Sequence, residues 1–360
     1  RSRGLGDVYK RQCEGRTEGL FQIETKLAGN YCKKFKPRTI EELGMVLALI
    51  RPGCLDSGIS QDVVKIRDGE KKTKPLDPKL GDILNETYGH MLYQESLMYV
   101  SQKLAGFDGG KANLLRKATG KKDPELMESL KKDFIDGCVG NGVKKDNAEK
   151  IWEMMEKSAN YSFNKSHSIS YAMISYWCAW IKVHYPVEFI TACLIHSKAE
   201  QDVNEKIALI INDAFMMGLN VLPPSVERGN KEYTIVDDRT IAFGYDSIKN
   251  IGSAQMKKVL KLYKTNRWET FLKDIINESI NKKVVESLVY SGALDCFNKT
   301  KKDMLIEYET IKNLTEREFD FVNKDLDSFS VIEAIKHLVD LDKLEGKEGK
   351  ARCINKTRKD

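Results

Sequence analysis

The sequence has no long apolar run and no closely paired cysteines. Its longest strongly apolar stretch covers roughly residues 171–181 and ends at Lys182, well short of the ~18–20 residues that cross a bilayer. No basic segment followed by an apolar one opens the chain, so we expect no secretory signal. Its eight cysteines are scattered without CxxC spacing, which indicates reduced thiols in a cytoplasmic protein. These absences argue against secreted, membrane and collagen-like proteins.

The motifs by which many enzymes are recognised are also missing. The chain contains no GxxxxGK[ST], GxGxxG, HExxH or GxSxG motif. Paired acids occur at Asp237-Asp238, Asp325/Asp327 and Asp340/Asp342, where solvated surface acids are a better interpretation than a two-metal site. The residues alone therefore predict no catalytic residue and no metal site in this chain.

Charge is nearly balanced over most of the chain. Lys and Arg total 59 against 53 Asp and Glu, a formal net charge of +6. Residues 1–16 and residues 345–360 each carry +3, so the body over 17–344 is neutral. The excess permits a nucleic-acid partner without demonstrating one, and any binding signal in the body has to be a local patch. Residues 1–16 lack helical or strand periodicity, which indicates a disordered or non-native end.

What the sequence does contain is helical periodicity. Over residues 40–50 the apolar side chains share one helix face, and Arg51-Pro52-Gly53 ends that pattern. Asp146 and Ser168 are candidate N-caps, and Gly218 is a candidate helix stop. Further helices are predicted at 92–104, 111–118, 124–136, 146–157, 168–183, 186–197 and 202–217.

The periodicity changes after Pro223-Pro224. Alternating apolar residues over 233–243 predict a short β-hairpin. Helices are predicted again at 254–264, 268–277, 281–291 and 301–316, before a charged tail. The fold class is therefore mostly α, with a small β insert between two helical regions.

Three segments have the composition of phosphate-binding sites. The first, residues 111–122, holds five basic side chains and no acid, on a helix that Gly120 is expected to end. Arg gives bidentate contacts to phosphate and Lys gives a point charge. The alternative is a solvated helix face. The basic candidates are Arg116, Lys117, Lys121 and Lys122.

The second segment, residues 161–171, places Asn, Lys, Ser and His in a row before a helix. A helix N-terminus is already favourable for anions through its free N–H groups and macrodipole. The alternatives are a polar capping turn and, for the tyrosine, a place in the core rather than stacking on a base. The candidates are Asn164, Lys165, Ser166, His167 and Tyr171.

The third segment, residues 247–264, has an apolar–polar–polar–apolar–Gly turn followed by a lysine-rich helix. Such a turn resembles a helix-hairpin-helix, whose N–H groups grip a DNA phosphate without reading sequence. The segment 249–264 carries five lysines and no acid; a plain solvated lysine face is the alternative. The candidate backbone contacts are Lys249, Ile251, Gly252, Lys257, Lys258 and Lys261.

Taken in order, these segments resemble the alpha subunits of bacterial DNA polymerase III, the family C replicative DNA polymerases. The blocks that carry the resemblance over about 17–310 are Gly19 to Glu24, Leu49 to Gly58, Tyr88 to Glu95, Leu114 to Lys122, Phe163 to Ala172, Trp180 to Phe189, Ile248 to Gly252 and Asn281 to Asp295. Cys54 stands where the family's Arg-Pro-Gly-Pro-Leu loop usually has proline. The resemblance implies a multi-helix fingers domain, a β-hairpin and a helix-hairpin-helix region.

The resemblance also implies roles and partners. In this family the basic helix and the Asn-Lys-Ser-His segment face the triphosphate of the incoming nucleotide and the primer terminus. The resemblance implies the same role for the candidates in residues 111–122 and 161–171. Two Mg²⁺ ions held by palm aspartates do the remaining electrostatic work. The implied partners are primer-template DNA, dNTPs and replisome subunits including a sliding clamp, with no membrane.

The chain departs from the family pattern in two ways. No Asp-x-Asp on a strand stands in for the palm aspartates, and no glutamine follows Gln255 to begin a clamp-binding peptide. We therefore expect a fragment of the catalytic subunit that is inactive alone. The predicted regions are a non-native end over 1–16, fingers over 17–224, a hairpin with helix-hairpin-helix over 225–300, and a helical extension with a basic mobile tail over 301–360. A stand-alone DNA-binding module and an α-helical scaffold are the alternatives.

Overall fold

The structure is a computed structural model that describes residues 14–121, 124–199, 201–264 and 266–340. Lys122 and the predicted basic tail over 345–360 lie outside these residues, as does most of the predicted N-terminal end. The chain divides into two compact units after Pro186, whereas the predicted boundary at residue 224 stays a prediction. Among the described residues no single helix is long and apolar enough to cross a membrane. The helices Lys165–His184 and Pro186–Ala199 reach that length and apolar composition only when counted together, as a pair with a bend between them.

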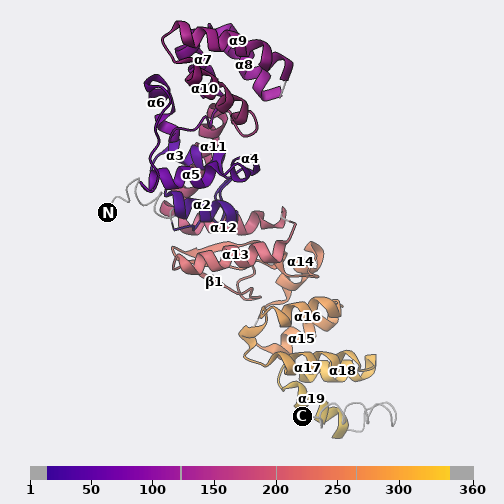
Figure 1. The fold of residues 1–360 in the computed structure, drawn as a ribbon. Coiled ribbons are helices and arrows are strands. Elements are labelled where there is room, and N and C mark those ends of the chain that lie inside the picture. Colours follow the sequence, from indigo (N-terminus) through magenta and orange to yellow (C-terminus); the bar gives the residue numbers. More distant parts are fainter. Residues whose placement is uncertain (1–13, 122–123, 200, 265, 341–360) are drawn as a thin grey trace. The chain divides into compact units, whose positions relative to one another are not determined.

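The first unit begins with a group of short helices packed around one long helix (Figure 1). Thr25 and Thr39 cap two of the short helices by accepting backbone N–H groups from the first turn. Gly44 lets the long helix approach closely, because a Cβ there would lie 2.8 Å from Ile169 Cδ1. The helices are α2 (Lys26–Phe35), α3 (Ile40–Leu49), α4 (Pro52–Asp56), α5 (Ile59–Arg67) and the long α11 (Lys165–His184).

A second group of helices in this unit has its own core. Phe134 packs against Trp152 with ring centroids 5.3 Å apart, and both side chains are fully buried. Gly137 allows two helices to cross closely, since a Cβ there would clash with the carbonyl oxygen of Ala105. The elements are α6 (Pro78–Leu84), the 3₁₀ turn η1 (Asn85–Thr87), α7 (Gln94–Ala105), α8 (Gly109–Lys121), α9 (Pro124–Gly140) and α10 (Lys145–Ser158).

The second unit opens with helices and a three-stranded sheet. The predicted hairpin is confirmed as the antiparallel pair of β2 and β3. An additional strand, β1, lies parallel to β3, so the order in the sheet is β1-β3-β2. Strand β1 is only three residues long, too short for an alternation of apolar and polar residues to be visible in the sequence. The elements are α12 (Pro186–His196), η2 (Ser197–Ala199), α13 (Val203–Met216), β1 (Asn220–Leu222), β2 (Thr234–Asp237) and β3 (Thr240–Ala242).

The remainder of the second unit is helical and shares one hydrophobic core. Its elements are η3 (Tyr245–Ser247), α14 (Ser253–Leu262), α15 (Trp268–Asn277), α16 (Lys282–Tyr290), η4 (Asp295–Phe297), α17 (Lys301–Lys312), α18 (Glu316–Asp325) and α19 (Val331–Asp340). The mostly α fold class predicted from the sequence is confirmed.

Three details of the predicted helices are wrong. The N-cap of α11 is Asn164, because the buried hydroxyl of Ser168 instead donates to the carbonyl of Gly44 at 2.5 Å. Asp146 lies in the first turn of α10 rather than at its cap. Gly120 lies inside α8 and does not end it; a helix tolerates one glycine at a cost of about 1 kcal/mol relative to alanine.

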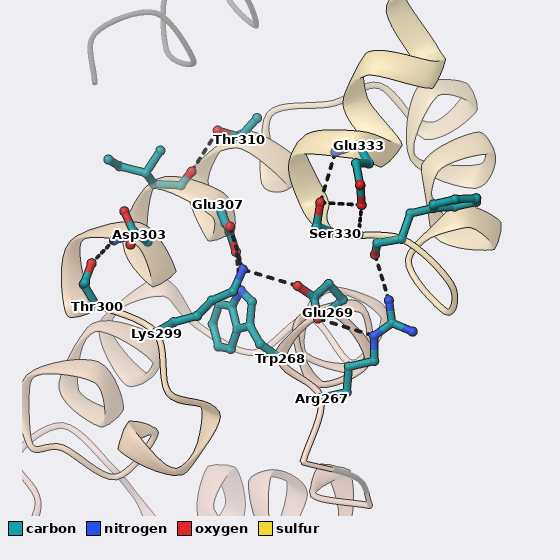
Figure 2. Close-up of polar contacts among 12 residues, drawn as sticks. Arg267, Trp268, Glu269, Lys299, Thr300, Asp303, Glu307, Thr310, Ser330 and Glu333 are labelled. Carbon is teal, nitrogen blue, oxygen red and sulfur yellow. Dashed lines mark hydrogen bonds and ion pairs between the residues drawn. The ribbon is translucent and has the colours of Figure 1, made fainter.

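A buried ionic cluster ties α15 to α17 in the second unit (Figure 2). Lys299 Nζ lies 2.7 Å from Glu307 Oε1 and 3.3 Å from Glu269 Oε1. The indole N–H of Trp268 donates to the other carboxylate oxygen of Glu307. Arg267 continues the cluster, because it pairs with Glu269 and donates to the carbonyl of Phe329 at 3.0 Å. Lys299 is thus the cation that two carboxylates share, each of them 9% exposed, and Arg267 is a second cation beside Glu269.

We expect Lys299→Met to destabilise the second unit by about 3 kcal/mol, because it leaves two buried carboxylates without their shared cation. Urea unfolding followed by tryptophan fluorescence measures the change, with Lys283→Met on the exposed surface of α16 as the matched control. Equal unfolding midpoints for the two variants would show that the cluster contributes no net stability.

Candidate nucleic-acid interface

The segment Asn164–His167 forms the first turn of α11. The Asn164 side chain accepts the His167 N–H at 2.8 Å and the Ser166 hydroxyl at 2.6 Å. Ser166 and His167 are exposed. The predicted capping turn is therefore present, and it holds the hydroxyl and imidazole candidates on the outer surface of the helix start.

Lys165 is held by two carboxylates from preceding elements. Its backbone N–H donates to Glu95 Oε2 at 2.9 Å, and its ammonium lies 2.6 Å from Glu86 Oε1. The ammonium also lies 5.7 Å from the centre of the Tyr93 ring. The Lys165 side chain is about one third exposed, so the charge is engaged but reachable from solvent.

A row of rings follows the same face of α11. His167 stacks on Tyr171 with ring centroids 4.0 Å apart and meets the edge of Phe163 at 5.3 Å. Tyr171 also contacts Phe21 at 5.2 Å and is half-buried. The guanidinium of Arg51 lies 3.9 Å from the centre of the Phe163 ring. Tyr171 is thus packed against other rings while part of its surface remains accessible.

The basic side chains of α8 have different environments. Lys111 is used internally, because it pairs with Asp133 and lies over the Phe107 ring. Arg116 is half-buried and donates to Asn113 at 3.1 Å, whereas Lys117 is exposed. Lys121 closes the described part of the helix. Lys117 is thus an exposed base that makes no ion pair with a described residue.

Gln94 joins the two phosphate-binding candidates. Its side-chain oxygen lies 3.5 Å from Arg116 Nη1 on α8, and its backbone N–H donates to the carbonyl of Phe163 at 2.8 Å. Phe163 in turn donates to Leu92, which completes a short parallel bridge between Tyr93 and Phe163. The start of α7 therefore lies beside the start of α11, and α8 contacts the start of α7 through Arg116 and Gln94.

Sequence reasoning missed Gln94, Glu95, Glu86 and Arg51 as parts of this arrangement. In the sequence, the Tyr88–Glu95 block stands out only as a stretch that matches the family. The available signal is a polar Gln-Glu pair at the start of a helix, which is also typical of an ordinary first turn. Contacts across 70 residues, such as Lys165 with Glu95, leave no spacing pattern in a single sequence.

The third candidate forms a tight turn before α14. Asn250 adopts a left-handed conformation with φ of 68°, and its amide donates to Ser287 on α16 at 3.2 Å. Ile248 and Ile251 are buried on either side of the turn. Gly252 is exposed, with φ of −79°, and an added Cβ would meet nothing within 4 Å. No residue that the structure describes requires glycine there, and the backbone is exposed.

Exposed lysines follow the turn. Lys264 pairs with Asp274 at 3.6 Å. Four of the predicted contacts, by contrast, make no ion pair with any residue that the structure describes: Lys249, Lys257, Lys258 and Lys261. Ile251 contributes its backbone rather than its side chain to this surface. The turn and α14 therefore present a cluster of free positive charge beside an open backbone.

The family's Mg²⁺ has no fitting ligands in the described part of the chain. Within it, no group of three or more His, Cys, Asp or Glu side chains converges closely enough to hold a metal ion. We assign no step through a metal to these residues.

Comparisons with known proteins show which family the sequence resembles. Residues 6–142 match the bacterial DNA polymerase III alpha subunit finger domain, and residues 218–304 match a helix-hairpin-helix motif. The DNA polymerase III subunit alpha of Aquifex aeolicus is 41% identical over 302 residues, covering 83% of this chain and 26% of that protein. The Campylobacter jejuni subunit is 36% identical, covering 86% and 26%, and the Escherichia coli K12 subunit is 34% identical, covering 78% and 25%.

The chain belongs to the DNA polymerase III alpha subunit family. It spans about a quarter of the length of the curated relatives it matches. The finger-domain match includes the Tyr88–Glu95 block and α8, and the helix-hairpin-helix match includes the turn before α14. The resemblance inferred from the sequence is confirmed, whereas the roles of individual residues remain predictions.

The cysteine that departs from the family's Arg-Pro-Gly-Pro-Leu loop is accommodated without strain. Cys54 is fully buried in α4, and its Sγ lies 3.9 Å from the carbonyl oxygen of Tyr161. Burial raises the pKa of this thiol to about 11, so it is a neutral packing group. Arg51 donates to the same carbonyl at 2.9 Å and keeps the loop against the start of α11.

We expect Asn164→Ala to loosen the first turn of α11, since removal of an N-cap costs about 1 kcal/mol. The His167 amide should then exchange with solvent about fivefold faster, measured by hydrogen–deuterium exchange. Asn164→Asp keeps the accepting oxygen and serves as the matched control. The same acceleration in both variants would mean that the side-chain oxygen does not cap the helix.

Proposed function

We propose that this chain supplies the nucleotide-binding and DNA-binding surfaces of a replicative DNA polymerase. The observation that carries the proposal is that Gln94 contacts both Arg116 on α8 and Phe163, the residue that precedes Asn164. It gathers cationic and hydroxyl side chains from two distant segments at one place in the first unit. Such a cluster suits a polyphosphate, because several donors act on one ligand.

The incoming dNTP would be held mainly by side chains rather than by backbone N–H groups. Glu95 and the Asn164 side chain already accept the N–H groups of Lys165 and His167. The remaining donors in the described part of the chain are the Lys165 ammonium, the His167 ring and the side chains of Arg116 and Lys117, and the Ser166 hydroxyl would join them on releasing the Asn164 oxygen. Binding of a triphosphate would require the Lys165 ammonium to exchange Glu86 for phosphate.

Primer-template DNA would contact the second unit through its backbone. The free lysines of α14 and the open Gly252 backbone suit a phosphate contact that does not read sequence. In the whole polymerase, Mg²⁺ would be held by carboxylates that the described residues do not assemble, and clamp or other replisome contacts would lie elsewhere. This chain would bind substrates without extending a primer by itself.

Lys165→Met should weaken dNTP binding by the purified chain about tenfold, because the variant cannot donate a charge-assisted hydrogen bond to the phosphates. Glu86→Gln should strengthen binding, since it frees the same ammonium. Calorimetric titration with dATP measures both affinities, and Lys150→Met on the exposed surface of α10 is the control. Unchanged affinity in Lys165→Met would remove this residue from the nucleotide site.

The double variant Lys257→Gln and Lys261→Gln should weaken duplex binding equally for unrelated sequences. The plot of log association constant against log salt concentration has a negative slope, and its magnitude should decrease by about 2. Each phosphate that the protein no longer neutralises reduces that magnitude by about 0.9. Filter binding over a range of salt concentrations measures it, with Lys336→Gln and Lys283→Gln as a charge-matched control. An unaltered slope would exclude α14 from the DNA surface, and absence of any binding would favour a scaffold.

A further inference from the structure

The first unit contains a cavity that the proposed polymerase role does not use. Its volume is about 770 Å³, within the range of roughly 300–1,000 Å³ typical of small-molecule sites. It lies among the end of α5, the loop over residues 71–75, α6 and η1. None of the residues predicted to bind dNTP or DNA lines it.

The loop over this cavity is fixed in place by close contacts with two glycines. A Cβ at Gly81 would lie 3.0 Å from Pro75, and one at Gly89 would lie 3.1 Å from Thr73. Gly89 also has φ of 85°, which favours glycine for its own conformation. Asn147 on α10 donates to the carbonyl of Leu76 at 2.6 Å and holds the end of the loop. The cavity wall is therefore a built structure.

The cavity interior combines an apolar surface with one polar pair. Ile66, Leu80, Leu84 and Met154 supply the apolar surface. Burial lowers the pKa of His90, so its ring is neutral at pH 7. His90 Nε2 is buried without a hydrogen bond and lies 3.5 Å from Asp62 Oδ2. The His90 ring can accept or donate a hydrogen bond at the edge of a flat ring, and the Asp62 carboxylate can accept one.

Positive charge gathers in the loop. Lys71 lies within 2.7 Å of both Asp62 oxygens and offsets that carboxylate. Lys72 and Lys74 also line the cavity and are exposed, and neither makes an ion pair with a described residue. Asp82 is the one other acid among the lining residues. Two ammonium groups without ion pairs therefore stand beside a cavity of the size of a small ligand, with one apolar part and one polar part.

We propose that this cavity binds a nucleoside phosphate. Its base would lie on the apolar surface with a polar edge toward His90 and Asp62, and its phosphate would contact Lys72 and Lys74. The 3₁₀ turn η1 relates this cavity to the proposed dNTP cluster, since Asn85 lines the cavity and Glu86 pairs with Lys165. The two sites share no residue, so they can be tested separately.

AMP is the probe, with adenosine and inorganic phosphate as its two halves. The methyl ¹³C signal of Met154 reports occupancy, and that of Met304 in the second unit is the reference. We expect AMP to shift the Met154 signal, with adenosine and phosphate each binding at least tenfold more weakly. Absence of a Met154 shift, or equal binding by phosphate alone, would overturn the proposal.

Variants separate this site from the proposed dNTP cluster. Lys72→Gln with Lys74→Gln should weaken AMP binding about tenfold or more, whereas Lys33→Gln with Lys34→Gln on α2 should leave it unchanged. Lys165→Met with Arg116→Gln should leave the Met154 response to AMP unchanged, whether or not the dNTP proposal holds, because neither residue lines the cavity. Loss of the Met154 response in that last variant alone would place the ligand at the start of α11 and refute the cavity site.

Discussion

The short bridge between Tyr93 and Phe163 is the contact on which the candidate nucleotide site depends. Two backbone hydrogen bonds, Phe163 to Leu92 and Gln94 to Phe163, place the starts of α7 and α11 side by side. With that register fixed, Glu95 reaches the Lys165 N–H and Gln94 reaches Arg116. The contacts of Leu92, Gln94 and Glu95 with Phe163 and Lys165 join the two helix groups of the first unit, whereas Gln94 and Arg116 lie within the same group. The side chains that could bind phosphate are therefore positioned by tertiary structure rather than by their own helices.

Packing of α11 on α3 determines which side chains at the start of α11 face outward. The Ser168 hydroxyl donates to Gly44 where the missing side chain allows close approach, which fixes the rotation of α11 one turn after Asn164. Two turns later along α11, the Ser175 hydroxyl makes a similar hydrogen bond by donating to the carbonyl of Phe21 at 2.7 Å. Because both serines face inward, Ser166 and His167 must face outward. The exposed polar residues at the helix start thus follow from buried polar contacts farther along it.

The sequence predicted the elements with strong local signals. The bounds of α15 agree with the predicted range, and Gly218 ends α13 with φ of 78° as expected. Weak local signals failed: α5 and α6 are short, β1 has three residues, and Ser168 resembled a cap although its hydroxyl is buried against Gly44. For the sites, basic runs predicted Arg116 and the α14 lysines as candidates, and their roles stay predictions. The runs could not reveal that Lys111 is paired with Asp133, or that Glu86 holds Lys165, because both partners lie outside the runs.

The carboxylates beside Lys165 are consistent with an anion-binding role. Glu86 is about half exposed, and pairs of that kind contribute only about 0–1 kcal/mol because water screens them. Exchange of this partner for a triphosphate would thus cost little. Glu95 differs, since it accepts a backbone N–H at the helix start, where negative charge is favoured by the macrodipole. One acid is thereby suited to leave and the other to stay, and the retained acid maintains the turn that presents Ser166 and His167.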